Sequence, residues 1–217
     1  MFFVGDVHGI IGPFLNILER RVRNGPCLQV GDMGLGFGGV SLPELKPQHR
    51  FIRGNHDDPA ACKAHPSYAG EFGYWEEHRL FFLGGAWSID LAWRKAWNAM
   101  HSPKKVWWED EELSPEQLEA AYQLYIKVKP ELVGTHEAPT EAAKYVLRDG
   151  FRQEKAECAN TRTSQALQRM FEAHQPRHWV FGHYHRTIDF RLGSVDGQSV
   201  ISTRFHCLTE LDLGEWE

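Results

Sequence analysis

The segment Phe2-Phe3-Val4-Gly5-Asp6-Val7-His8-Gly9, residues 2–9, is a short apolar run that ends in a glycine and polar residues. Apolar residues then recur at helical spacing over residues 11–22, and residues 27–30 form a second apolar run before Gly31-Asp32. A strand, a one-sided helix and a second strand within about thirty residues predict a βαβ unit with adjacent parallel strands. We expect Asp6 and Asp32 side by side at the carboxyl ends of these strands, where open α/β sheets build their sites.

Three later segments repeat this arrangement. Residues 50–53 precede Gly54-Asn55-His56-Asp57, residues 131–133 precede Gly134-Thr135-His136, and residues 178–181 precede Gly182-His183-Tyr184-His185. A glycine at each junction suits a chain that leaves a strand sharply and needs room for its backbone beside a ligand. Together the five junctions predict one shared edge that carries a functional site.

The side chains expected at that edge are carboxylates, imidazoles and one carboxamide: Asp6, His8, Asp32, Asn55, His136, His183 and His185. A single histidine or aspartate of this kind is more often structural than a ligand, and only their joint occurrence favours metal binding. Such groups bind divalent ions such as manganese, iron, zinc or nickel, and the set lacks the thiolates of structural zinc sites. The set is too large for one ion with an open position, so we expect two ions. Asp32 bridges them, and the other ligands divide as Asp6, His8 and His185 for one ion and Asn55, His136 and His183 for the other.

With these motifs in this order from residue 5 to residue 185, the chain resembles the calcineurin-like metallophosphoesterase family. The resemblance implies an α/β fold, a four-layer α/β/β/α sandwich, and the same division of ligands between two metal ions. It also implies a metal-dependent phosphoric ester hydrolase in which His56 contacts the phosphate and assists the leaving group.

The expected mechanism follows from two cations about 3.5–4 Å apart, which lower the pKa of a bridging water, hold a phosphate in line and neutralise charge. A metal-bridging hydroxide would attack the phosphorus, and manganese is the preferred assignment for the ions. His56 would act as a general acid or an electrostatic stabiliser, and Asp57 or Asp58 could orient its imidazole ring.

The sequence departs from the family pattern in one place. Members that resemble the serine/threonine protein phosphatases carry Asp-Arg-Gly shortly after the second motif, whereas residues 33–39 here are Met-Gly-Leu-Gly-Phe-Gly-Gly. The departure removes an arginine for phosphate and an aspartate partner for His56, and it argues against protein phosphatase activity. The remaining candidates for phosphate contact are Arg53, Arg94, Arg162 and Arg186.

Residues 87–130 form an expected elaboration or lid, helical in part and rich in tryptophan, within a single domain over residues 1–217. They hold Trp87, Trp93, Trp97, Trp107 and Trp108, which could stack on an aromatic substrate but more often serve packing. Ser114-Pro115-Glu116-Gln117 is a capping box with proline at the first helical position, and it predicts a helix to about Val128.

The remaining segments complete the predicted scaffold. Residues 79–83 read as a strand without ligands, and residues 141–175 read as helices that are interrupted near Gly150 and restart around residues 160–164. Residues 187–213 alternate in polarity and contain turn glycines at Gly193 and Gly197, which predicts antiparallel hairpins at the closing edge.

The composition limits the partners. Lys and Arg total 24 against 29 Asp and Glu, a formal charge of −5 that gives no global attraction for long nucleic acid. No apolar stretch approaches the roughly 18 residues of a membrane span. Residues 1–4 lead straight into the first motif without a secretory signal, so we expect a cytoplasmic protein away from membranes. The four cysteines, Cys27, Cys62, Cys158 and Cys207, form no CxxC pair and agree with a reduced compartment.

The leading functional hypothesis is therefore an enzyme that hydrolyses a phosphorylated substrate, with phosphomonoesters favoured over diesters. A nucleotide or nucleic-acid phosphodiesterase is the alternative within this class. The alternative outside it is a non-catalytic, metal-binding module for protein interaction, against which the complete ligand set and His56 argue.

Overall fold

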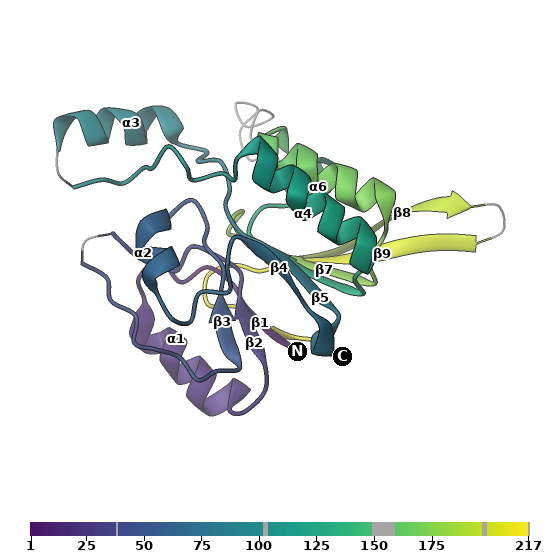
Figure 1. The fold of residues 1–217 in the computed structure, drawn as a ribbon, viewed down its shortest axis with the longest axis horizontal. Coiled ribbons are helices and arrows are strands. Elements are labelled where there is room, and N and C mark those ends of the chain that lie inside the picture. Colours follow the sequence, from purple (N-terminus) through teal and green to yellow (C-terminus); the bar gives the residue numbers. More distant parts are fainter. Residues whose placement is uncertain (38, 102–103, 149–158, 197–198, 217) are drawn as a thin grey trace.

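The computed structural model describes residues 1–37, 39–101, 104–148, 159–196 and 199–216, and Figure 1 shows their fold. A first, four-stranded sheet has the order β10-β1-β2-β3. Its strands are β1 (Phe2–Val4), β2 (Cys27–Gln29), β3 (His49–Phe51) and β10 (Leu213–Glu215). Strands β1, β2 and β3 run parallel, with Phe2 opposite Cys27 and Cys27 opposite His49, and β10 is antiparallel to β1. The predicted βαβ unit is confirmed.

The second sheet has six strands in the order β4-β5-β6-β7-β9-β8. They are β4 (Phe72–Trp75), β5 (Leu80–Leu83), β6 (Leu132–Thr135), β7 (His178–Phe181), β8 (Ile188–Asp196) and β9 (Ser199–Cys207). The four inner strands are parallel, and the two edge strands β4 and β8 are antiparallel to their neighbours. A short 3₁₀ turn, Glu76–His78, joins β4 to β5.

The two sheets face each other across a shared apolar core. That core contains residues of both sheets: Phe3, Leu28, Val30, Ile52, Leu80, Phe82, Leu132, Val180 and Leu208. Adjacent residues of the same strands point to the outer faces, as the period-two alternation of strands requires. Val4 packs with Phe14 of α1, and Phe81 packs with Tyr125 of α4.

Helices cover both outer faces, as Figure 1 shows. Helix α1 (Ile11–Ile17), which continues as a π-helical turn over Leu18–Val22, and α2 (Pro59–Ala64) pack on the first sheet. Helices α4 (Pro115–Val128), α5 (Thr140–Leu147) and α6 (Arg162–Ala173) pack on the second. The result is the expected four-layer α/β/β/α sandwich.

Helix α3 (Leu91–Met100) stands apart from the sandwich in Figure 1. It belongs to the tryptophan-rich part of residues 87–130, whereas α4, in the same range, packs against the second sheet. Ser114 caps α4 through the predicted reciprocal hydrogen bonds with Gln117. Within the described residues, no helix is long and apolar enough to cross a membrane.

Two expectations for the scaffold need correction. Strand β4 was not predicted, because it is a half-buried edge strand interrupted by Gly73, where the ring of Phe82 occupies the space of a Cβ. Residues 188–207 form one antiparallel hairpin, β8–β9, in which Gly193 lies inside β8 opposite Ser202 and not in a turn. Strand β9 lies inside the second sheet parallel to β7, and the following β10 joins the first sheet instead. The predicted interruption near Gly150 and the turn at Gly197 lie outside the described residues.

Candidate metal centre and active site

The seven predicted ligands lie just beyond the carboxyl ends of strands of both sheets. Asp6, Asp32 and Asn55 follow β1, β2 and β3 of the first sheet. The four histidines follow strands of either sheet: His8 after β1, His136 after β6, and His183 and His185 after β7. Parallel strands end at the same edge, so residues far apart in the sequence meet there.

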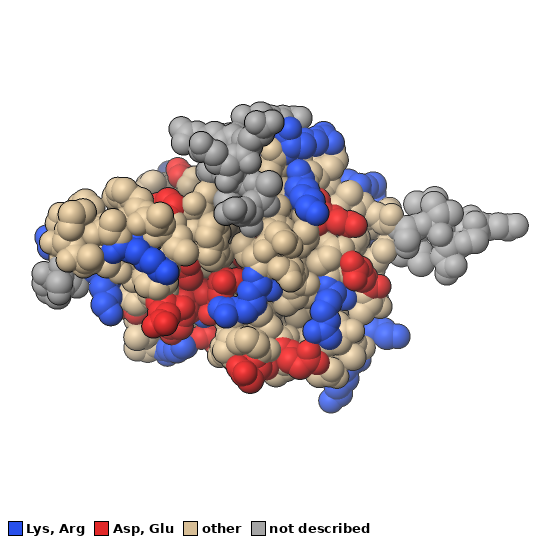
Figure 2. Space-filling model, turned by 90° about the horizontal axis from the view of Figure 1, so that it is seen from above, with Lys and Arg blue, Asp and Glu red and all other residues tan. Residues whose placement is uncertain are grey.

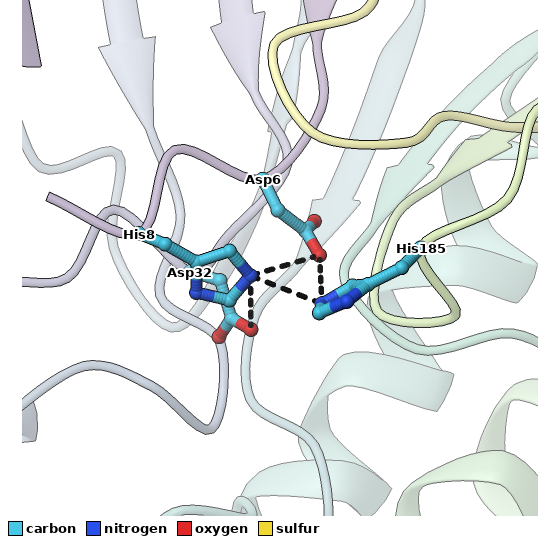
Figure 3. Close-up of side chains that lie close together, drawn as sticks. All are labelled: Asp6, His8, Asp32 and His185. Carbon is cyan, nitrogen blue, oxygen red and sulfur yellow. Dashed lines mark hydrogen bonds and ion pairs between the residues drawn. The ribbon is translucent and has the colours of Figure 1, made fainter. Parts of the chain in front are cut away.

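Four of these residues form a compact group, which Figure 3 shows. Asp6, His8, Asp32 and His185 each offer a ligand atom within 4.8 Å of the others. His8 Nε2 lies 3.0 Å from His185 Nε2, and Asp6 Oδ2 lies 3.2 Å from His185 Nε2 and 3.7 Å from His8 Nε2. These four side chains could hold one metal ion.

The other three predicted ligands form a second group, in which His136 approaches Asp32 Oδ1. His136 Nε2 lies 3.2 Å from Asp32 Oδ1 and 3.3 Å from Asn55 Oδ1. His183 Nδ1 lies 2.9 Å from the same Asn55 oxygen. The carboxamide oxygen and both imidazoles therefore face one point, beside the group around Asp6.

Four of the ligands hold a backbone conformation that is uncommon for residues with a side chain. The φ angles are 47° for His8, 55° for Asp32, 69° for His183 and 50° for His185. Each such residue costs on the order of 1–3 kcal/mol, and they concentrate at functional sites. Two backbone hydrogen bonds hold the loops of His8 and Asp32 together, because the carbonyl of Asp32 accepts from the N–H groups of Val7 and His8 at 2.9 and 2.8 Å.

Three of the junction glycines are required because a side chain would occupy ligand space. A Cβ on Gly31 or Gly54 would collide with the ring of His136, and one on Gly182 would collide with the carboxylate of Asp6. Only Gly31 of the three also has a positive φ, 99°. The predicted need for room is confirmed, whereas unusual dihedrals are not needed at the other two positions.

The electrostatics of the site match a divalent cation. Asp6 and Asp32 are buried, and burial alone would raise their pKa values, but the surrounding histidines outweigh it and lower them. Burial alone would likewise lower the pKa of His136, but the charge of Asp32 raises it to about 10, so this ring carries a proton that an ion would replace. Burial and His136 lower the pKa of His183 to about 3, which leaves its nitrogen lone pair free.

One further observation supports a metal. Asp6 Oδ2 is buried, and within the described part of the chain its near neighbours are the ring nitrogens of His185 and His8, at 3.2 and 3.7 Å, neither of them in hydrogen-bonding geometry. A buried carboxylate oxygen that lies beside imidazole nitrogens without a hydrogen bond is costly, and a cation bound between these atoms would remove that cost. The oxygen and nitrogen donors therefore fit hard or borderline divalent ions.

His56 lies beside this centre but its ring belongs to neither group. It packs edge-on to His8 at 4.7 Å between ring centroids and stacks on Phe37 at 5.6 Å. Arg94 Nη2 lies within hydrogen-bonding distance of both ring nitrogens of His56. Burial lowers the pKa of His56 to about 4. The charge of Asp32 opposes this shift, and the charge of Arg94 adds to it.

Arg94 is itself held firmly, at 2% exposure. Its Nε donates to Asp90 Oδ1 at 2.5 Å, and its Nη1 donates to the carbonyl of Val106 at 2.9 Å. Sequence reasoning named Arg94 among four equivalent arginines. No local signal singled it out, because its contact with His56 depends on where α3 docks.

Asp57 occupies a different place from the one expected. Its fully buried carboxylate accepts four backbone N–H groups, from Met33, Gly34, Leu35 and Gly54, at 2.7 to 3.2 Å. These bonds shape the loop that follows Asp32 and do not orient the His56 ring. Asp58 accepts from the N–H of Ala60 as the N-cap of α2. Arg94 is thus the observed partner of His56.

The other proposed phosphate contacts are separated by the structure. Arg53 is 1% exposed and is held by the carboxylate of Glu71 and the carbonyl of Glu111, which favours a structural role. Arg162 is an exposed residue that pairs with Glu112 at 3.7 Å. Arg186 lines the cleft at the metal centre and donates to the carbonyl of Val146.

The cleft beside the centre has a volume of about 330 Å³. Its lining contains ligands, His56 and several flanking side chains: Asp32, Asn55, His56, Ile89, Asp90, Leu147, His183, Tyr184, His185 and Arg186. None of the expected lid tryptophans lines it. Trp97 stacks on His101, Lys95 lies over the ring of Trp107, and Trp108 contacts Phe37. Trp97 and Trp108 also line a separate cleft.

Comparison with known proteins identifies a family for this chain. The family model described as calcineurin-like phosphoesterase matches residues 1–187. No curated protein matches the sequence significantly. Among solved structures, the crystal structure of phosphopantetheinyl hydrolase from Mycobacterium tuberculosis matches with 13% identity and a TM-score of 0.47, over 96% of this chain and 89% of that chain.

Proposed function

The chain belongs to the calcineurin-like phosphoesterase family and is a metal-dependent phosphoric ester hydrolase, and we propose that it cleaves small phosphomonoesters at a centre of two divalent ions. The proposed ligands are those that the sequence indicated. Asp6, His8 and His185 would hold one ion, and Asn55, His136 and His183 the other. Manganese is the ion that we would test first.

The position of Asp32 carries the proposal of two ions. Its Oδ2 lies 3.9 Å from His8 Nε2 in the first group, and its Oδ1 lies 3.2 Å from His136 Nε2 in the second. One carboxylate therefore offers an oxygen to each side. The N–H of His56 donates to Oδ1 at 2.7 Å and fixes this orientation.

Two ions at these positions would supply Lewis acidity toward the phosphate and a more acidic water molecule. The chain itself supplies the groups around the phosphate. Arg94 can only donate, and its Nη2 lies near both ring nitrogens of His56, so the nitrogen that accepts from it carries no proton. In the neutral ring the other nitrogen carries the proton, and it could donate to a phosphate oxygen or the leaving group. Arg186 adds positive charge in the lining of the cleft, whereas the buried Arg94 is paired with Asp90.

Two observations support a small monoester. A cleft of about 330 Å³ is at the lower end of the range of small-molecule sites. A monoester carries more negative charge than a diester, and Arg186 in the lining of the cleft adds a cation to match it. A long nucleic acid is a poorer candidate, since basic and acidic side chains are interspersed on the face shown in Figure 2.

The test uses the metal-stripped protein reloaded with increasing Mn²⁺. Hydrolysis of an aryl phosphate should rise until two equivalents are bound, and kcat/KM for this monoester should exceed that for the corresponding bis-aryl diester. A preference for the diester would favour a phosphodiesterase. Full activity at one equivalent would contradict the two-ion centre.

A further inference from the structure

Three buried side chains form a hydrogen-bonded series that leads from the proposed metal centre into the segment before α4. Asn55 Nδ2 donates to Ser88 Oγ at 3.3 Å, and Ser88 Oγ donates to Glu111 Oε2 at 2.5 Å. The backbone N–H of Ser88 donates to the other oxygen, Glu111 Oε1, at 2.9 Å. The exposures of Asn55, Ser88 and Glu111 are 3%, 0% and 3%.

The direction of these hydrogen bonds is set at the Glu111 end. A carboxylate only accepts, so the single hydroxyl proton of Ser88 must point to Glu111. The lone pairs of Ser88 then face Asn55, which must present its NH₂ group to them. The carboxamide oxygen of Asn55 is thereby turned to His136 and His183, where a metal ligand is needed.

Glu111 is held in place for this task. Its backbone carbonyl accepts from Arg53 Nη1 at 2.6 Å and from the N–H of Ala86 at 3.3 Å. Arg53 is in turn fixed by an ion pair with Glu71 at 2.7 Å. Burial raises the pKa of Glu111, and its two hydrogen bonds from Ser88 oppose this and favour the carboxylate.

We propose that Ser88 and Glu111 are positioning residues that fix the carboxamide of Asn55 with its oxygen toward the second metal ion. The inference rests on the proposed two-ion centre. If the carboxamide of Asn55 were reversed, its NH₂ group would face the second metal ion, and an NH₂ group of an amide cannot ligate a metal. The second site would then lose one ligand, while the first site would keep all of its ligands.

Glu111→Gln tests the direction of the hydrogen bonds from Asn55 through Ser88 to Glu111, and it hardly changes the shape of the side chain. The N–H of Ser88 can only donate, so it takes the Gln oxygen, and the Gln NH₂ group then donates to Ser88 Oγ. The Ser88 proton is released toward Asn55 and favours the reversed amide. Loss of a partner that orients a metal ligand typically costs about 10–100-fold in metal affinity, and we expect a loss of this size for the second ion only.

Glu112→Gln is the matched control. Glu112 Oε1 accepts from the N–H and the hydroxyl of Thr163, both at 2.9 Å, so the same substitution disturbs the same kinds of donor one residue away. Its hydrogen bonds do not lead to Asn55. Ser88→Ala is a second variant, which leaves Asn55 without its acceptor and should weaken the second ion by roughly tenfold.

The measurement is Mn²⁺ binding to each metal-stripped protein by equilibrium dialysis with elemental analysis, together with the electron paramagnetic resonance signal of coupled manganese pairs. Wild type and Glu112→Gln should bind two ions and give the coupled signal. Glu111→Gln and Ser88→Ala should bind the first ion normally and give an uncoupled signal at concentrations that saturate wild type. Thermal unfolding of the metal-free proteins checks that each variant folds.

Two results would overturn the inference, and they are distinguishable. If wild type binds two ions and both variants bind the second ion with wild-type affinity, the positioning role is wrong and the two-ion centre stands. If wild type binds only one ion, the proposed centre is itself wrong, and the inference falls with it.

Discussion

Replacement of Arg94 by methionine tests the most specific contact of the proposed active site. The guanidinium group is 2% exposed and donates to the His56 ring, to Asp90 and to the carbonyl of Val106. Methionine keeps much of the volume and removes every donor. The variant therefore keeps the His56 side chain but removes the Arg94 guanidinium group that donates to its ring.

The expected magnitude follows from the kind of bond. A hydrogen bond with a charged donor is worth about 1.5–3 kcal/mol, which corresponds to a loss of about 10–150-fold in kcat/KM. The loss should appear in kcat if Arg94 acts by orienting His56, because the ground-state complex would still bind at the metals. Arg94→Lys should recover only part, since an ammonium group keeps the charge but not the planar fork.

The assay is steady-state hydrolysis of an aryl phosphate by protein whose metal content has been confirmed by elemental analysis. Arg169→Met is a suitable control, because Arg169 is an exposed arginine paired with Glu119 at 3.0 Å, and its kcat/KM should stay within about twofold of wild type. Wild-type kcat/KM in Arg94→Met would refute the role of Arg94. An activity loss explained wholly by missing metal would refute it equally.

Four further predictions follow from the same structure. His56→Ala should keep both ions and lose about 10²–10⁴ in kcat, and stoichiometric loss of metal in elemental analysis would contradict its assignment as a non-ligand. Asp32→Asn should weaken both ions together in dialysis, because each oxygen of Asp32 faces one group; loss of a single ion would count against bridging. Asp57→Ala should lower the free energy of unfolding in urea by about 2–5 kcal/mol, since four buried backbone N–H groups lose their acceptor, partly offset by removal of a carboxylate whose pKa burial raises to about 6. Unchanged stability with a low kcat would instead favour orientation of His56. Burial, with the charge of His206, lowers the pKa of His178 to about 4, so the stability that its neutral form gives is complete above about pH 6.5 and is lost as the pH falls toward 4. The ring is only partly buried, so solvent screens part of this effect. In EDTA, His178→Gln should lose up to about 1 kcal/mol less than wild type between pH 7 and 5, and parallel losses would show that this ring does not titrate as described.

The gathering of the proposed ligands at one edge could be predicted from the sequence because its signal is local. Each ligand follows a short apolar strand, usually across a glycine, and parallel strands bring their ends to one edge regardless of the chain between them. The glycines at Gly31, Gly54 and Gly182 strengthen that signal, since a side chain there would collide with His136 or Asp6. Residues such as these are recognisable without knowledge of the rest of the fold.

The surroundings of His56 could not be predicted in the same way. Asp57 was assigned to orient His56 because the two are adjacent, but its carboxylate turns into the loop of residues 33–35 and Gly54. Arg94 is 38 residues away from His56 and reaches it only through the docking of α3. Neither contact has a periodicity or a spacing that a sequence would display. Arg53 was separated from the candidates for phosphate contact by its bonds to the carboxylate of Glu71 and the carbonyl of Glu111, which no local pattern indicates.

The segment between β5 and α4 contacts both a proposed metal ligand and the proposed phosphate contact His56. Strand ends supply the metal ligands, but Ser88, Arg94 and Glu111 all come from this one segment, and they act on the consecutive residues Asn55 and His56. Asn55 would ligate the second ion, and His56 would contact the phosphate. A shift of the segment would thus change the second metal site and the position of His56 together, while Asp6, His8 and His185 stayed in place.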